Sequence, residues 1–175
     1  MTARAGETFE TGQAAAEIEA LLAEPVPATG PTVTEGDPVS GEWTVTRGEG
    51  FVSVPLWEGD SLTGVYAPEW NDAEEAAEAQ LADLVEELDR RWGSHRPVSM
   101  RVPIFRNIED QPMPALFQAL CDEDLLGDLA VWGPVPAGSA TNGRWVAVSL
   151  NQSDGDAPMI IAAVVSDRPI IELDE

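Results

Sequence analysis

The stretch MIIAAVV, residues 159–165, decides the fold. A strand with one face in water alternates apolar and polar residues, whereas a strand covered on both faces is apolar throughout. The run therefore predicts a central strand, covered on one side by a helix and on the other side by a second element.

Several β-prone runs lie upstream of this strand, and turn-forming residues separate them. Two of these runs are 129–132 and 144–150, and turns at 133–143 and 153–156 follow them. Together with the central strand, they predict three consecutive antiparallel strands, of which the central strand is the last. Pro55 lies in a further run and has no backbone N–H, so that strand is expected at a sheet edge or with a bulge. Alternation of apolar residues over 98–104 predicts a half-buried strand ended by proline. The remaining strand runs are 43–47 and 51–57.

The longest helix is expected between an Asn71 or Asp72 cap and Gly93, because Leu81, Leu84 and Leu88 recur at helical spacing. Shorter helices are expected over 14–22 and 114–121. The pattern predicts an α+β fold: a mainly antiparallel sheet of about five to six strands packed on one long helix, with short extra helices.

The length of 175 residues is typical of one domain. Residues 24–40 contain four prolines among small residues, which excludes a persistent helix or central strand there. We therefore expect an amino-terminal helix and a Pro-rich flexible arm over 1–40, and a single α+β domain over 41–175.

The charge is strongly acidic: 32 Asp and Glu face nine basic residues, a formal net charge of −23, and every basic residue is Arg. Such a field repels phosphate backbones and anionic lipid headgroups, so neither direct nucleic-acid binding nor membrane binding is expected. A basic protein or a cationic surface is favoured instead. The alternative is that acidity serves only solubility, and the absence of Lys is typical of a GC-rich, bacterial-type composition.

Cys121 is the only cysteine, so no internal disulfide forms. No apolar run is long enough to span a bilayer, and the first residues lack the apolar core of a signal peptide. A cytoplasmic location is expected. The acidic neighbours of Cys121 favour a buried structural thiol over a nucleophile.

The usual catalytic motifs are absent from the sequence, and His95 is the only histidine. Acids cluster at 122–128 and at 154–156, but a calcium loop that starts at Asp122 places Leu126 and Gly133 where oxygen ligands are required. A hairpin turn explains Asp154 and Asp156. We expect no cofactor and no metal site.

Two surfaces are candidates for binding. If the aliphatic residues of strands 129–132 and 144–150 face the long helix, Trp132 and Trp145 form a cross-strand pair on the other face, either covered or available to a partner. The second candidate is the acidic surface of the long helix, where the acids are Glu75, Glu78, Asp83, Glu86 and Glu87.

These features favour a non-enzymatic acidic protein-binding module of the inhibitor, immunity-protein or secretion-chaperone type, acting on a basic partner. Two alternatives stay open. One is an acid- or divalent-metal-dependent hydrolase that uses the acids of the two clusters: Asp122, Asp124, Asp128, Asp154 and Asp156. The other is a structural homodimer subunit that associates through the tryptophan face.

Overall fold

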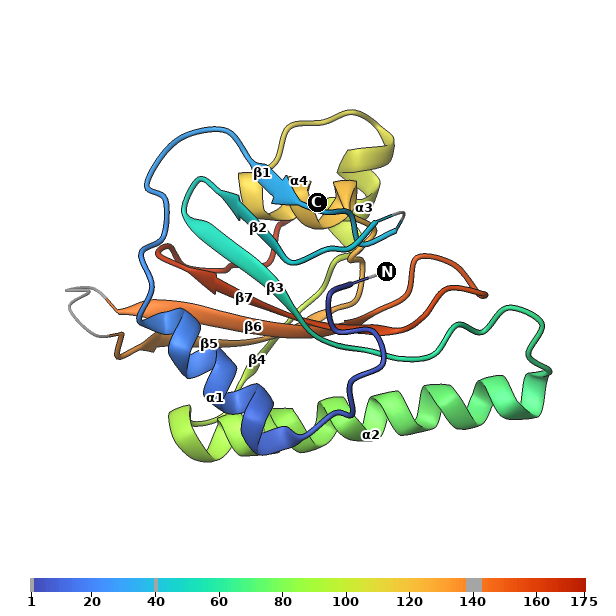
Figure 1. Cartoon of the computed structure of the whole chain (residues 1–175). Helices are drawn as coiled ribbons and strands as arrows, with labels where there is room; N and C mark the ends of the chain where they lie inside the picture. Colours follow the sequence, from blue (N-terminus) through green and yellow to red (C-terminus); the bar gives the residue numbers. More distant parts are fainter. Residues whose placement is uncertain (1, 40, 138–142) are drawn as a thin grey trace.

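The computed structural model describes residues 2–39, 41–137 and 143–175, and its centre is an antiparallel sheet with helices on both faces (Figure 1). In the described chain, the sheet contains seven strands in the order β1-β2-β3-β7-β6-β5-β4. The strands are β1 Val33–Glu35, β2 Val45–Gly48, β3 Phe51–Glu58, β4 Arg96–Val98, β5 Leu129–Val135, β6 Arg144–Asn151 and β7 Ile160–Ser166. The helices are α1 Thr11–Leu22, α2 Ala67–Trp92, α3 Arg101–Ile108 and α4 Ala115–Asp122. The α+β fold with a sheet packed on one long helix is confirmed, although the sheet is larger than the five to six strands expected.

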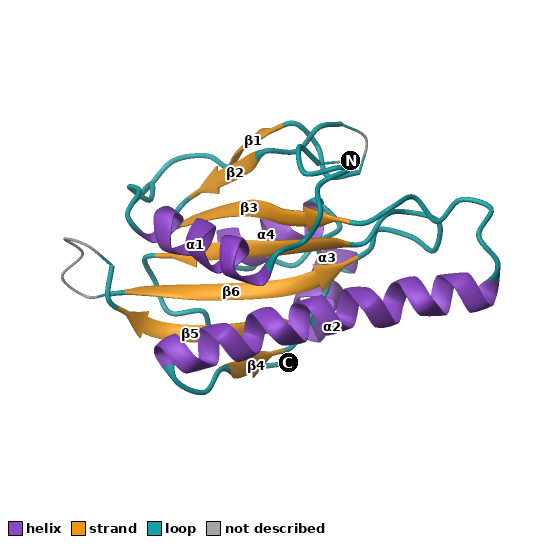
Figure 2. Cartoon of the chain, turned by 60° about the horizontal axis from the view of Figure 1, so that its bottom comes forward, coloured by secondary structure: helices purple, strands orange, loops and turns teal. Residues whose placement is uncertain are grey.

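Strand β7 lies in the middle of the sheet, hydrogen-bonded to β3 on one side and to β6 on the other. All of its residues are buried. Ile161, Ala163 and Val165 join the core under α1 and α2, whereas the alternate residues join the core under α4 (Figure 2). The prediction of a central strand covered on both faces is therefore confirmed.

Helix α2 buries only one stripe, Ala77, Leu84 and Leu88. Its carboxyl-terminal half lies on the sheet, and its amino-terminal half extends beyond the ends of the strands (Figures 1 and 2). The helix begins at Ala67, before the expected Asn71 or Asp72 cap. The expected start was wrong because the helix already includes Pro68 in its first turn. Backbone N–H groups of the first turn have no acceptor within the helix, so proline, which lacks this N–H, is tolerated there.

Residues 98–104 do not form the single strand that their alternation predicts. Strand β4 ends at Val98, and α3 begins at Arg101. Pro103 was taken as a strand terminator, but it lies in the first helical turn, where proline is tolerated. The Asp128 carboxylate accepts a hydrogen bond from the Met100 backbone N–H at 2.8 Å, which holds the chain at the point where it changes from strand to helix.

Strand β3 is an interior strand rather than an edge strand, and the expected bulge is present as a register shift between Pro55 and Trp57. The Gly/Pro-rich turn expected at 133–143 includes residues 138–142, which lie outside the described residues. No helix in the described part of the chain is both long and apolar enough to cross a membrane.

The first 40 residues contact the rest of the protein at several points. Ala15 and Ile18 of α1 share a core with Leu84 and Leu88 of α2. Strand β1, within the Pro-rich arm, pairs with β2 at the edge of the sheet. The division into an arm over 1–40 and a domain over 41–175 stays a prediction.

Replacing Leu84 tests the packing of α2 on the sheet. Leu84 is fully buried, so Leu84→Ala is expected to lower the free energy of unfolding by about 2–5 kcal/mol, measured by urea denaturation. The adjacent Asp83 is exposed, and Asp83→Ala is expected to change stability by no more than about 0.5 kcal/mol. Equal effects of the two substitutions would contradict the orientation of α2.

Candidate functional site

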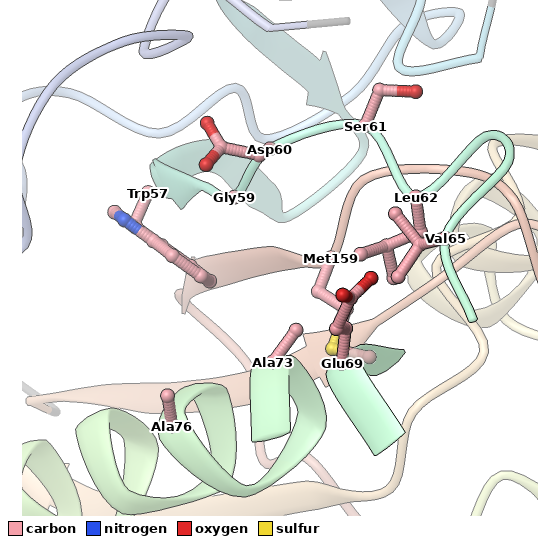
Figure 3. A pocket seen from close by; sticks show the side chains of 10 residues that line it. All are labelled: Trp57, Gly59, Asp60, Ser61, Leu62, Val65, Glu69, Ala73, Ala76 and Met159. Atoms are coloured by element: carbon pink, nitrogen blue, oxygen red, sulfur yellow. The ribbon is translucent and has the colours of Figure 1, made fainter. Parts of the chain in front are cut away.

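A pocket of about 410 Å³ lies where β3 leaves the sheet and the chain turns into α2. We call it the α2 pocket. Loop 59–66, the end of β3, the amino-terminal half of α2 and Met159, which directly precedes β7, form its walls (Figure 3). The residues that line it are Trp57, Gly59, Asp60, Ser61, Leu62, Val65, Glu69, Ala73, Ala76 and Met159.

Backbone and side-chain hydrogen bonds fix the walls of the α2 pocket. The Gly59 N–H donates to the Met159 carbonyl at 2.8 Å, and the Leu62 N–H donates to the Asp156 carbonyl at 3.0 Å. On the helix side, the Trp70 indole N–H donates to the Gly155 carbonyl at 2.9 Å. The loop and the projecting half of α2 are therefore both anchored to the turn between β6 and β7, which pre-forms the pocket.

The lining combines an apolar interior with an acidic rim. Leu62 and Met159 are buried in a small core with Ala77 of α2, and the Trp57 ring packs against the same cluster. Asp60 and Glu69 are exposed, and they come from the loop and from the helix respectively. None of the described residues that line the pocket is basic. The pocket thus favours an apolar group with a cationic neighbour over an anion.

The acids expected on the long helix fall into two groups. Glu75, Glu78, Asp83 and Glu86 are exposed on the side of α2 that faces away from the sheet, and none forms an ion pair with another described residue. We call these four residues the acidic face. Glu87 is different, because its carboxylate pairs with Arg90 at 3.1 Å and with Arg91 at 3.7 Å.

Trp132 and Trp145 do not form a cross-strand pair. Trp132 pairs with Val146 in the β5–β6 register, and directly paired residues share a face, so both lie under the helices α1 and α2. Trp145 lies on the opposite face against Gly133 and the core under α4. The expected tryptophan face was wrong because Leu129 and Val131 face α4 rather than the long helix.

Trp132 instead holds the carboxyl-terminal end of α2. Its indole N–H lies 3.0 Å from both the Asp89 carboxylate and the Gly93 carbonyl. Asp89 also accepts the His95 backbone N–H at 2.9 Å, and the His95 ring nitrogen Nδ1 lies 3.1 Å from it. Burial acts to raise the pKa of Asp89, but these hydrogen bonds outweigh it and hold the pKa below its ordinary value. The cluster is a structural clamp at the helix end.

The acids of the hydrolase hypothesis belong to separate local structures. Asp128 caps the start of α3, and Asp154 accepts the N–H groups of Asp156 and Ala157 within its own turn. Asp122 accepts a hydrogen bond from Gln118 on the same helix. Among the described residues, no group of three or more His, Cys, Asp or Glu side chains is placed to hold a metal ion.

Sequence reasoning missed the α2 pocket, although one signal was present. Leu62 and Val65 are apolar residues in a segment that otherwise has the composition of a loop, and such residues are expected to pack against a neighbouring element. Placing the helix start at Asn71 left Glu69 outside the helix, so its position beside Ala73 and Ala76 was not recognised.

Glu123, at the end of α4, is a partly buried carboxylate. It accepts a hydrogen bond from the Thr46 hydroxyl at 2.9 Å, and Thr46 accepts the Trp43 indole N–H at 3.0 Å, which ties α4 to β2. Burial raises the pKa of Glu123 to about 7; the Thr46 hydrogen bond opposes this shift, while the negative charges of Asp37 and Asp122 add to it.

Glu123 makes stability depend on pH in a defined direction. Because its pKa is higher in the folded than in the unfolded protein, ionisation destabilises the fold progressively as pH rises from about 4.5 to about 7. Glu123→Gln is therefore expected to stabilise the protein relative to the native chain by about 1–3 kcal/mol at pH 8 and much less at pH 4.5. Urea denaturation across this range measures the difference, with the exposed Glu109→Gln as control. If the difference in unfolding free energy between Glu123→Gln and the native chain does not change with pH, the raised pKa of Glu123 is refuted.

Cys121 is buried, and burial together with Asp122 and Asp124 raises its pKa to about 11. A thiol-reactive disulfide reagent at pH 8 is expected to modify the folded protein at least about 10-fold more slowly than the urea-unfolded chain, since little thiolate is present and access is blocked. Equal rates would show that the thiol is accessible.

The chain matches no protein-family model, and comparison with curated proteins and with solved structures finds no similar protein. The function is therefore inferred from two features of α2 itself. They are the α2 pocket, at the projecting half of the helix, and the acidic face, whose Glu75 and Glu78 lie in that half and whose Asp83 and Glu86 lie in the half that covers the sheet.

Proposed function

We propose that the protein is a non-enzymatic binding module that receives a basic segment of another protein along the exposed side of α2. The acidic face carries this proposal. Its carboxylates are exposed, lie on one helix side and form no ion pair with another described residue, so they are available to counter-charges from a partner.

The basic residues of the chain support this assignment by their positions. Arg4 pairs with Glu17, Arg101 with Glu175, and Arg168 with Glu49, all outside the acidic face. On α2 itself, Arg90 and Arg91 lie in the last turn and pair with Glu87. The exposed side of α2 before its last turn therefore carries a negative field that no described basic residue compensates, within a chain of net charge −23.

Such a field mainly affects the rate of association and the choice of partner. An exposed ion pair contributes only about 0.2–1 kcal/mol, so several pairs together are needed for useful affinity. The same field raises association rates for cationic partners and repels nucleic acids and other acidic proteins. The proposal thus predicts binding that weakens steeply as salt is added.

Neutralising the acidic face tests the proposal. Glu75→Gln, Glu78→Gln, Asp83→Asn and Glu86→Gln are combined in one variant. We expect it to bind an arginine-rich peptide at least about 10-fold more weakly at about 50 mM salt, because several favourable charge pairs are lost. Isothermal titration calorimetry measures the affinity, and the loss should shrink at about 0.5 M salt.

A matched control variant separates local from total charge. Glu24→Gln, Glu42→Gln, Glu109→Gln and Asp110→Asn change the net charge by the same amount at exposed positions away from α2. This variant should retain most of the native chain's affinity for the arginine-rich peptide. If the two variants weaken binding equally, only the overall charge matters and the acidic face is not the binding site.

A further inference from the structure

We infer that the α2 pocket is the anchor site for an apolar side chain, aromatic or long aliphatic, that is flanked by arginine or lysine in the partner segment. This inference rests on the proposed function and identifies the kind of segment that the site selects. Its support is the combination of an apolar interior and an acidic rim, on the same helix that carries the acidic face.

The interior of the α2 pocket suits an apolar group. Leu62, Val65 and Met159 form one side, and the Trp57 ring forms the opposite side (Figure 3). A charged group placed deep in this interior would lose its water without gaining a partner, which is unfavourable. An apolar side chain gains free energy in proportion to the surface that it removes from water.

The size of the α2 pocket limits what enters it. At about 410 Å³ it lies near the lower end of small-molecule sites, which span roughly 300–1,000 Å³. It accommodates a bulky side chain with some of its neighbouring backbone, but not a packed helix face. We therefore expect a single anchor residue.

The rim determines which residues flank the anchor. Asp60 on the loop and Glu69 on the first turn of α2 are carboxylates on different walls of the pocket (Figure 3). Neighbouring residues of an extended segment are spaced about 3.3 Å apart, so cationic residues on either side of the anchor come within reach of the rim. Beyond the rim, the acid of the acidic face on the same side of α2 as Ala76 is Asp83, two turns further along the helix, whereas Glu75 and Glu78 lie around the helix from the pocket. A second copy of this chain is disfavoured as the occupant because its own net charge is −23.

Two peptides of equal length and charge test the inference. Both carry arginines on each side of the centre, and the central residue is phenylalanine in one and alanine in the other. We expect the phenylalanine peptide to bind the native chain at least about 10-fold more tightly at about 0.15 M salt, because only its central side chain fills the pocket. Titration calorimetry gives both dissociation constants.

Filling the α2 pocket should remove this preference. Ala76 and Ala79 are both exposed and lie one turn apart on α2, but only Ala76 is among the residues that line the pocket. Ala76→Phe is expected to make the two peptides bind alike, and Ala79→Phe should keep the preference. The same substitution in the same helix makes the two variants comparable in stability, and circular dichroism checks that both fold.

A second pair of variants perturbs the pocket from the loop. A methyl group at Gly59 would lie 2.9 Å from Cη2 of Trp57 and displace the ring, whereas one at Gly155 meets no atom within 4 Å. Gly59→Ala should weaken binding of the phenylalanine peptide more than binding of the alanine peptide. Gly155→Ala should leave both unchanged.

The possible outcomes separate the two proposals. If both peptides bind the native chain equally, or if Ala76→Phe keeps the preference, the anchor site is overturned while binding to a basic partner stands. If neither peptide binds the native chain at low salt, both proposals fail.

Discussion

The burial of β7 on both faces is the constraint on which the rest of the structure depends. Its alternate residues join two different cores, so the sheet needs helices on each side. Helices α1 and α2 cover one face, and α3 and α4 cover the other (Figure 2). Strands β3 and β6 flank β7 for a related reason, since a strand without an exposed face requires hydrogen-bonded neighbours on both edges.

The projecting half of α2 is a consequence of a mismatch in length. A helix of 26 residues is about 39 Å long, whereas the seven residues of β7 extend about 24 Å. The part of the helix beyond the strands has no sheet to cover, and it packs on loop 59–66 and the turn between β6 and β7 instead. This smaller contact leaves the α2 pocket between helix and loop. Glu75 and Glu78 of the acidic face lie on this projecting half, while Asp83 and Glu86 are exposed on the outer side of the half that covers the sheet.

Sequence reasoning was most successful where one physical preference dominates. The run 159–165 is apolar at every position, and the leucine spacing of α2 fits only a helix, so both elements were predicted with their roles in the core. It failed where one residue permits two structures. The long helix was expected to begin after Pro68, and Pro103 was interpreted as the end of a strand, yet both prolines occupy first helical turns. For Trp132 the alternation was correct, but the face that α2 covers is decided by topology and cannot be read from one strand.

The α2 pocket was not predictable from spacing alone. Its lining comes from β3, the following loop, α2 and Met159 directly before β7, and these segments meet only once the strand order is known. The exposure of the four acids of the acidic face was foreseen from helical periodicity. That the same helix also lines an apolar pocket could be seen only in the three-dimensional structure.

The central claim is that a basic segment binds along the exposed side of α2. Amide and indole chemical shifts of the isotope-labelled protein, followed during titration with the arginine-flanked phenylalanine peptide, test it most directly. The largest shifts should fall on the Trp57 indole and on Leu62, Val65 and Ala73, with smaller shifts along the acidic face. Shifts confined to α3 and α4 on the opposite side of the sheet would contradict the claim.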